Sequence, residues 1–307
     1  MTPSYIALLE SGELGRRVET ARAMLADCRL CPRECGVNRL EGETGTCGAG
    51  AAARVSSHNS HHGEEPPISG SRGSGTIFLT HCNLKCSFCQ NYPISHLGNG
   101  SDVSPGELAA MMLSLQTRGC HNINFVTPTH YMPQIIEALE IAARGGLRVP
   151  LVYNCGGYES LDAVRLLEGI VDIYMPDIKY ADEEPAMKLS RAPRYFEHAT
   201  AAVTEMYRQV GTLQMDDDGI ATRGLLIRHL VLPAGLAGSR KVLEFIARKL
   251  SKDVFVSVME QYFPAHLACG IPGMDRGITA GEYAGVVDIV DELGLENGWI
   301  QGDPSAY

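Results

Sequence analysis

Two tight groups of cysteine residues limit what this chain can fold into more than any other sequence feature. The chain contains ten cysteines. One group comprises Cys28, Cys31, Cys35 and Cys47, and the other comprises Cys82, Cys86 and Cys89. Clustered cysteines in a chain of this size bind metal more often than they form disulfides. We therefore expect two metal-binding segments, and we expect the three isolated cysteines to be buried structural thiols, namely Cys120, Cys155 and Cys269.

Composition and charge indicate a folded protein that acts on a small molecule or on another protein. The 307 residues are 45% hydrophobic and 20% charged, and their formal net charge is -10. That charge argues against binding to nucleic acid or to an anionic membrane surface. Neither a secretory h-region nor a run of about 18 apolar residues is present in the sequence. We expect a cytoplasmic protein.

From residue 76 onward, short apolar and β-branched runs alternate with helical stretches. Six runs are candidate strands, at residues 76–80, 122–127, 149–153, 171–175, 224–231 and 254–259. Ser104 with Glu107, and Thr279 with Glu282, have the spacing of helix capping boxes. This alternation predicts an α/β fold with parallel strands, and six units favour a partial (β/α)6 barrel over an open doubly wound sheet.

The first quarter of the chain has a different character. Apolar spacing predicts one helix over residues 3–26, and the Gly-, Ser-, His- and Pro-rich stretch 28–75 should be irregular and ordered by metal. We therefore divide the chain into residues 1–75, an N-terminal helix with a cysteine-rich metal-binding extension, and residues 76–307, the barrel domain.

The second cysteine group follows directly on the first predicted barrel strand. Cys82, Cys86 and Cys89 are spaced CxxxCxxC, so their thiols should lie in a loop at the strand's C-terminal end. Four-iron clusters are usually closed by four thiolates. Three thiolates leave one iron open to a substrate or cofactor, as catalytic metal sites require. A zinc site and isolated thiols are the alternatives.

This motif, with Phe88 just before its last cysteine, resembles the signature of the radical S-adenosylmethionine (SAM) superfamily. The chain is also similar, over nearly its full length, to uncharacterised relatives of the pyruvate formate-lyase activating enzyme. The phrases that carry this similarity are CPRECGVNR, HCNLKCSFCQN, NINFVTPTH and VDIYMPDIKY. The resemblance implies a [4Fe–4S] cluster on the three cysteines, reductive cleavage of SAM to a 5′-deoxyadenosyl radical, an electron donor such as flavodoxin or ferredoxin, and a glycyl radical enzyme as one conceivable partner.

Polar residues at successive strand ends are candidates for binding SAM, because ligand sites of parallel barrels gather there. In the activating enzymes a Gly-Gly-Glu loop receives the SAM amino group, and Thr127-Pro128-Thr129-His130 stands in its place here. Thr127 and Thr129 could serve an ammonium group, or Thr129 could simply cap a helix. The remaining candidates are Asn154, Asp177, Lys179 and Arg228, with Gln261 and Tyr262 as weaker ones.

Asp177 and Lys179 alternate along one strand, so both should face the barrel interior. The resemblance implies that Asp177 and Lys179 help to hold SAM and that Asn154 lies near a monovalent cation. Arg228 could reach the SAM carboxylate or a substrate anion through its planar donors. Ordinary strand-end ion pairs are the competing interpretation for the Asp177–Lys179 pair.

The N-terminal cysteine group has enough thiols to close a tetrahedral site. Four thiolates suit zinc, a single iron or a second cluster, and the spacing does not choose among them. A structural metal is favoured over an electron relay. His58, His61 and His62 form another small group. We interpret it as a solvated loop, although one of these residues, or His130, could donate a proton near substrate.

Three functions fit these features. The first is a radical SAM enzyme that abstracts hydrogen from a substrate, which could be a glycine of a partner enzyme. The second is a radical SAM enzyme that modifies a small metabolite or a peptide. The third is an iron–sulfur electron-transfer protein without SAM chemistry, which a fourth thiolate in the central group would favour.

Overall fold

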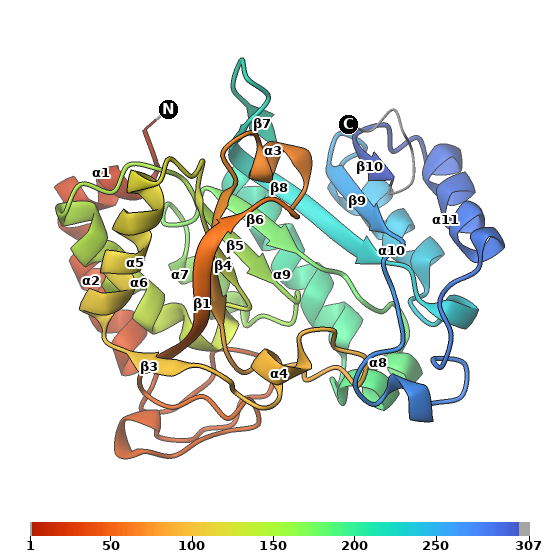
Figure 1. Cartoon of the computed structure of the whole chain (residues 1–307), viewed down its shortest axis with the longest axis horizontal. Coiled ribbons are helices and arrows are strands. Elements are labelled where there is room, and N and C mark those ends of the chain that lie inside the picture. Colours follow the sequence, from red (N-terminus) through yellow and green to blue (C-terminus); the bar gives the residue numbers. More distant parts are fainter. Residues whose placement is uncertain (1, 301–307) are drawn as a thin grey trace.

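The computed structural model describes residues 2–300 and centres on a twisted sheet that does not close into a full barrel (Figure 1). The strand order is β10-β9-β8-β6-β5-β4-β2-β1-β3, with β7 paired to β8 outside that path. Strands β2, β4, β5, β6, β8, β9 and β10 run parallel, whereas β1, β3 and β7 are antiparallel to their neighbours. The fold is therefore α/β with a mostly parallel sheet that is not closed, consistent with the predicted partial (β/α)6 barrel.

Each predicted strand is present within a few residues of its expected position. The strands are β1 (Ala53–His61), β2 (Ser74–Leu79), β3 (Ser101–Val103), β4 (Ile123–Val126), β5 (Leu151–Cys155), β6 (Ile173–Pro176), β7 (Gln214–Met215), β8 (Ala221–Leu230), β9 (Phe255–Met259) and β10 (Gly298–Ile300). The six predicted runs correspond to β2, β4, β5, β6, β8 and β9. Their near-continuous burial reflects helices on one face and a filled interior on the other.

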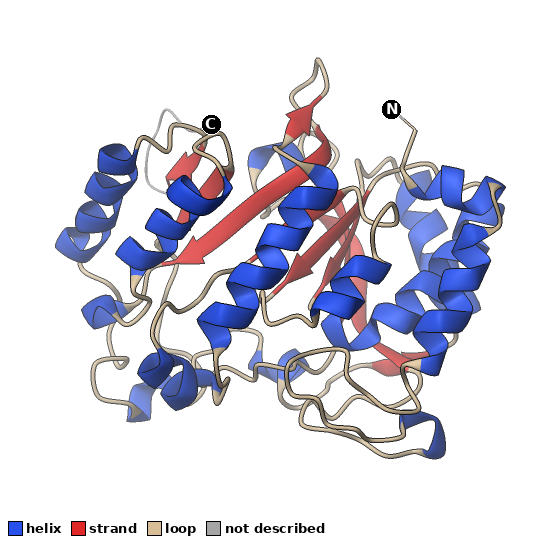
Figure 2. Cartoon of the chain, turned by 180° about the vertical axis from the view of Figure 1, so that it is seen from behind, coloured by secondary structure: helices blue, strands red, loops and turns tan. Residues whose placement is uncertain are grey.

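The longer helices lie across the outer face of the strands (Figure 2). The helices of the described residues are α1 (Tyr5–Glu10), α2 (Glu13–Ala23), α3 (Pro66–Ser69), α4 (Tyr92–Ser95), α5 (Pro105–Thr117), α6 (Met132–Arg144), α7 (Leu161–Leu166), α8 (Glu183–Ser190), α9 (Tyr195–Val210), α10 (Ser239–Phe245) and α11 (Ala280–Leu293). Short 3-10 or π turns complete the set, at Arg39–Glu41, Thr129–Tyr131, Pro233–Gly235, Ile246–Leu250 and Ala268–Gly270.

Both predicted capping boxes are confirmed. The Ser104 hydroxyl accepts a 3.2 Å hydrogen bond from the Glu107 amide at the start of α5. The Thr279 hydroxyl accepts the equivalent 3.1 Å bond from Glu282 at the start of α11. In both cases the glutamate side chain also reaches back to the backbone of the capping residue, so the otherwise unpaired amides of the first turn are satisfied.

The first 75 residues differ from their prediction in two ways. The single helix expected over residues 3–26 is broken into α1 and α2, because Gly12 adopts a left-handed conformation with φ of 75°. The stretch 28–75 is not irregular throughout, since β1 and α3 lie within it. Strand β1 pairs antiparallel with β2, so this segment extends the barrel sheet.

Helix α3 fills the concave interior of the sheet near the N-terminal ends of the strands. Ile68 of α3 is fully buried in a cluster with inward-facing residues of three strands, namely Val152, Ile173, Met175 and Leu226. Two residues further along the same strands, the inward side chains become polar: Asn154, Asp177 and Arg228. The interior thus changes from an apolar plug to a polar cavity toward the strands' C-terminal ends. Within residues 2–300, no helix has the length and apolar composition that crossing a bilayer requires.

Candidate functional site

The loop after β2 brings the three cysteines of the central motif to one cavity. Cys82, Cys86 and Cys89 all line a cavity of about 370 Å³ at the C-terminal ends of the strands. His81 and Lys85 of this loop have left-handed backbones, with φ values of 66° and 47°, so the loop is tightly bent at both residues. These bends help three closely spaced cysteines to present their sulfur atoms to the same space.

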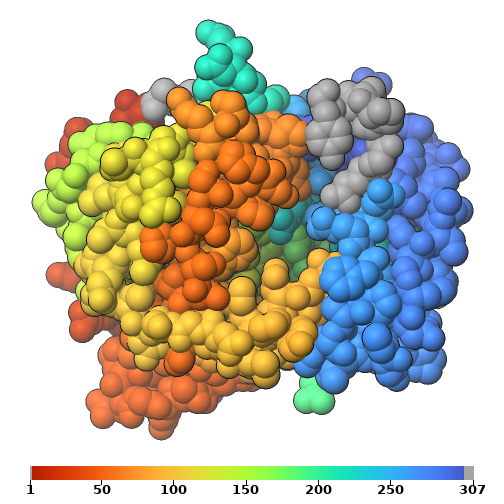
Figure 3. All heavy atoms as spheres, viewed as in Figure 1, coloured from red at the N-terminus to blue at the C-terminus, as the bar shows by residue number. Residues whose placement is uncertain are grey.

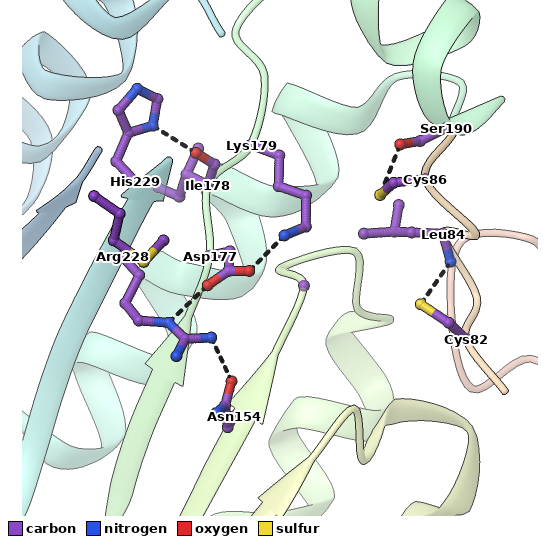
Figure 4. A network of polar contacts seen from close by, with 12 residues as sticks. Cys82, Leu84, Cys86, Asn154, Asp177, Ile178, Lys179, Ser190, Arg228 and His229 are labelled. Atoms are coloured by element: carbon purple, nitrogen blue, oxygen red, sulfur yellow. Dashed lines mark hydrogen bonds and ion pairs between the residues drawn. The ribbon is translucent and has the colours of Figure 1, made fainter. Parts of the chain in front are cut away.

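Each of the three thiols has a hydrogen-bond partner, two of them nearby in the sequence and one on α8. The Leu84 amide donates to the sulfur of Cys82 at 3.4 Å, and the Ser190 hydroxyl donates to that of Cys86 at 3.0 Å (Figure 4). The Cys89 sulfur lies 3.1 Å from the hydroxyl of Ser95.

Burial raises the pKa of the Cys82 thiol to about 12, so a thiolate here requires positive charge of the kind that a metal supplies. Three soft sulfur donors around one cavity fit a [4Fe–4S] cluster with one iron left for another ligand. Gly156 keeps room for such a group. A Cβ at that position would lie 2.6 Å from Leu84 Cδ1 and 3.7 Å from Lys179 Cε. The donor set and the space around it are therefore compatible with the cluster.

A buried network of charges forms the opposite wall of the cavity (Figure 4). Arg228 donates from Nε to Asp177 Oδ1 at 2.8 Å and from Nη2 to Asn154 Oδ1 at 2.6 Å. Lys179 Nζ forms an ion pair with the other oxygen of Asp177. Thus Asn154, Asp177, Lys179 and Arg228, which the sequence singled out separately, lie together.

The charges in this network hold one another ionised despite their burial. Burial favours neutral Asp177, but the neighbouring Arg228 and Lys179 cations outweigh it and lower the pKa of the carboxyl. Burial likewise opposes charge on Lys179, and the Asp177 carboxylate outweighs it and raises the pKa of the amine. Lys179 lies between Asp177 and the cysteine loop, where a cationic donor can meet a ligand's carboxylate.

The two threonines of the TPTH segment have different surroundings. Thr127 lines the cavity and has a left-handed backbone with φ of 60°, which is unusual for a β-branched residue. Thr129 is buried and turned away, with its hydroxyl donating to Glu159 at 2.6 Å. It is neither part of the described cavity lining nor the N-cap of α6, which is Tyr131.

The histidines that could donate protons are also separated by the structure. His130 is buried, and burial lowers the pKa of its imidazole to about 3, so the ring is neutral. It is not among the described residues that line the cavity. His61 lies on β1, packs edge-on against Phe78 and lines the cavity. The solvated loop expected for His58 and His61 is instead part of β1.

Gln261 lines the cavity, whereas Tyr262 packs beside it. The ring of Tyr262 meets that of Phe88 edge-on, and its hydroxyl donates to the Met274 carbonyl at 2.6 Å. Tyr262 therefore supports the cysteine loop from behind.

Among the isolated cysteines, Cys120 and Cys155 are buried as expected, but Cys269 is exposed. The prediction of a buried structural thiol at Cys269 was wrong, because a Gly- and Pro-rich loop carries it along the surface.

Glu64 is a cavity residue that the sequence did not single out. It comes from the segment between β1 and α3, and its Oε2 lies 3.3 Å from Arg228 Nη1. Asn124 Nδ2 donates to its Oε1 at 3.1 Å. In the sequence, Glu64 lies in a Gly-Glu-Glu-Pro stretch, which is typical of a solvated turn. The sequence therefore offered no reason to place it in a cavity.

The N-terminal cysteine group lies against the central loop. Burial raises the pKa of the Cys31 thiol to about 12, and the side chain of Asn83, the neighbour of Cys82, lies near enough to offset a small part of that rise. Cys47 is buried and interacts electrostatically with Cys28 and Cys35. In residues 2–300, no three His, Cys, Asp or Glu side chains converge as the ligands of a single metal ion do. A second metal at this group stays a prediction.

Comparisons with known proteins agree with this geometry. The family model described as the radical SAM superfamily matches residues 76–214, from β2 to β7, which includes the three cysteines and Lys179. The chain is also 30% identical over 293 residues to an uncharacterized protein of Methanocaldococcus jannaschii, an alignment that covers 92% of this chain and 80% of that relative. The chain belongs to the radical SAM superfamily, a family that combines a [4Fe–4S] cluster with SAM for radical chemistry.

Proposed function

We propose that this protein binds a [4Fe–4S] cluster through Cys82, Cys86 and Cys89 and uses SAM to abstract a hydrogen atom from an organic substrate. The observation that carries the proposal is the meeting of these three thiols with the Asp177–Lys179–Arg228–Asn154 network across one cavity. When bound, the cluster supplies the electron that cleaves SAM to methionine and a 5′-deoxyadenosyl radical.

The chain's own residues bind and orient SAM in this proposal. Lys179 offers its ammonium group to the SAM carboxylate, while Asp177 fixes the position of Lys179. Asn154 and Thr127 face the same space and offer oxygen atoms to the SAM amino group. Arg228 is committed to Asp177, Asn154 and Glu64, so we assign it to positioning these residues and not to a substrate anion.

The nature of the substrate is a further part of the proposal. Activation of a glycyl radical enzyme draws its support from the resemblance of the sequence to uncharacterised relatives of the pyruvate formate-lyase activating enzyme. Modification of a peptide or small metabolite would use the same residues. The open side of the sheet admits a substrate in either case, because the face is hollowed between the N-terminal and C-terminal segments (Figure 3).

The test begins with anaerobic purification and quantification of iron and sulfide. SAM and dithionite are then added, with flavodoxin or ferredoxin in place of dithionite in a second series, and 5′-deoxyadenosine is measured. We expect turnover in the native protein and none in Cys82→Ala, Cys86→Ala or Cys89→Ala. A reconstituted cluster that yields no 5′-deoxyadenosine would contradict the proposal and favour an electron-transfer protein.

Lys179→Ala should mainly weaken SAM binding, by about tenfold or more, since a charge-assisted contact is lost. The matched control is Lys188→Ala, because Lys188 is exposed on α8. Equal SAM affinity in the two variants would remove Lys179 from the binding site.

We also propose that Cys28, Cys31, Cys35 and Cys47 hold a second metal, either zinc or iron. The burial of Cys47 and the closeness of Cys31 to the Asn83 side chain support it. Metal analysis of the triple variant that lacks the central cysteines tests it directly. Zinc or iron should remain in that variant and disappear when Cys47 is replaced as well.

A further inference from the structure

A second, smaller cavity lies beside the main one, between the two edges of the open sheet. Its volume is about 170 Å³, and it shares Glu64, Arg228 and Met259 with the main cavity. Glu65 and Trp299 are among the described residues that complete its lining. The shared residues make the two spaces neighbours, so a molecule in the main cavity can extend a group into the smaller one.

A buried carboxylate in this small cavity has one oxygen without a hydrogen-bond partner among the described residues. Glu65 is only 9% exposed, and within residues 2–300 its Oε2 atom has no hydrogen-bond partner. Its backbone carbonyl caps α3 by accepting from the amides of Ile68 and Ser69, a task that does not involve the side chain. An unpartnered buried carboxylate is costly, so its presence calls for a reason other than the fold.

The charged side chains around the two cavities do not give Glu65 Oε2 a hydrogen-bond donor among residues 2–300. Burial raises the pKa of Glu64 and favours its neutral form, so Glu65 and Asp177 are the carboxylates that face the cations Lys179 and Arg228. Arg228 attracts Glu65 electrostatically, but its hydrogen bonds go to Asp177, Asn154 and Glu64. A positively charged ligand with N–H donors would supply the hydrogen bond that Glu65 Oε2 lacks.

The walls of the small cavity also suit a cation. Trp299 is the single tryptophan of the chain, and its ring stacks on Phe255 with centroids 5.5 Å apart. Indole is the aromatic group that attracts cations most strongly. A volume of about 170 Å³ is too small for a nucleoside but can hold the head group of a side chain or an alkylamine.

We propose that the small cavity binds a positively charged head group of the substrate, an ammonium or a guanidinium, with Glu65 as its principal counter-charge. The inference rests on the proposed function, because it takes the remainder of the substrate to lie in the main cavity. It assigns the substrate to the cationic organic compounds, such as amines and peptides that carry lysine or arginine.

The experiment uses the intrinsic fluorescence of Trp299 in the full-length, cluster-reconstituted protein with SAM present. The probes are n-butylguanidinium and n-butylammonium, with neutral n-butylurea and anionic n-pentanoate as comparisons of similar size. We expect a saturable change with the cations and none with the other two. Glu65→Gln should weaken cation binding about ten- to a hundredfold, because a charge-assisted contact is lost.

Glu184→Gln serves as the matched control, since Glu184 is exposed on α8, and it should bind the cations like the native protein. Circular dichroism confirms that both variants are folded. The inference is overturned if the cations produce no saturable change, if urea or carboxylate binds equally well, or if Glu65→Gln binds like the control. Measuring 5′-deoxyadenosine in the same preparation separates the two proposals, because its absence counts against the SAM chemistry whatever the cations do.

Discussion

Hydroxyl groups next to the cysteine sulfur atoms are the residue-scale feature with the clearest chemical consequence. Ser190, at the end of α8, donates to Cys86, and Tyr180 lies 2.7 Å from the same serine hydroxyl. Ser95 contacts Cys89 at 3.1 Å. Hydrogen bonds to cluster sulfur atoms stabilise the more negative, reduced state and so raise the reduction potential. These serines should therefore set how readily the proposed cluster accepts an electron.

Ser190→Ala should shift the midpoint potential of the cluster to more negative values, because Cys86 loses its hydroxyl donor. A redox titration monitored by electron paramagnetic resonance measures the shift. Ser190→Thr keeps a hydroxyl donor, so its midpoint potential should lie closer to that of the native protein. Ser101→Ala, at an exposed position, is the control. A native potential in Ser190→Ala would show that the contact with Cys86 has no electronic effect.

Glu159 gives the protein a pH-dependent stability. Burial raises the pKa of its carboxyl from 4.5 to about 7, although Thr129 and Tyr153 donate hydrogen bonds to it. A raised pKa means that the folded state holds the proton more tightly than the unfolded chain. The stabilisation is therefore complete below pH 4.5 and is lost as the pH rises through about 7. The total contribution of Glu159 to the free energy of unfolding that is lost is about 3 kcal/mol.

Glu159→Gln should abolish this contribution while keeping the shape of the side chain. We expect the difference in unfolding free energy between the native protein and the variant to change by up to about 3 kcal/mol between pH 5 and pH 8, with the variant gaining relative stability at high pH. Denaturant unfolding across that range measures it. A difference that stays constant with pH would mean that Glu159 ionises normally.

At the scale of elements, the sequence predicted the strands that have a clear apolar pattern. It missed the strand whose formation depends on tertiary contacts. The six barrel strands were found because their runs are apolar and β-branched. Strand β1 was missed because its second half, Ser57–His61, is rich in Ser, His and Asn, and pairing with β2 outweighs that weak propensity. Glu64 could not be assigned to the cavity for the same reason, since its position depends on β1. Thr129 was a candidate for SAM binding, but its hydroxyl donates to Glu159 and does not face the cavity, which only the folded structure reveals.

Arg33 is one of the side chains that hold the N-terminal cysteine segment against the barrel. Arg33 donates to the backbone carbonyls of Asn83, Ser190 and Arg191, and its guanidinium lies 5.4 Å from the centre of the Tyr158 ring. Several charge-assisted donors on one planar group suit this role, which lysine could not reproduce. Arg33 thereby connects the two cysteine groups.

Arg33→Ala should loosen residues 28–47 while leaving the barrel intact. We expect their amide hydrogen exchange to accelerate about tenfold or more, because losing even one such charged hydrogen bond costs about 1.5 to 3 kcal/mol. Arg29→Ala is the matched control, since Arg29 lies in the same segment and its one ion pair is an exposed contact with Asp27. Equal exchange in both variants would contradict the assigned role of Arg33.

At the scale of the whole molecule, residues 2–75 and 76–300 contribute to one hydrophobic core. Tyr5 and Leu14 from the first segment are fully buried in the same cluster as Leu139 of α6 and Leu167 after α7. Ile68 of α3 plugs the interior of the barrel. The edge of β2 is covered by β1. The division of the chain into an extension and a barrel domain therefore follows its sequence motifs, whereas the two parts pack around a common core.

A chain that begins at residue 74 should therefore fail to fold on its own. It would expose the edge of β2 and the apolar interior around Val152 and Met175, and both are aggregation hazards. Size-exclusion chromatography and thermal unfolding of residues 74–307 test this expectation, and a soluble monomer with a cooperative transition would contradict it. Co-expression of residues 1–73 as a separate polypeptide is the sharper comparison. Because β1 pairs with β2 from Val55 to His61, with one irregularity, and α3 is buried inside the barrel, the two pieces should recover a soluble complex, whereas a piece that ends at residue 52, before β1, should not.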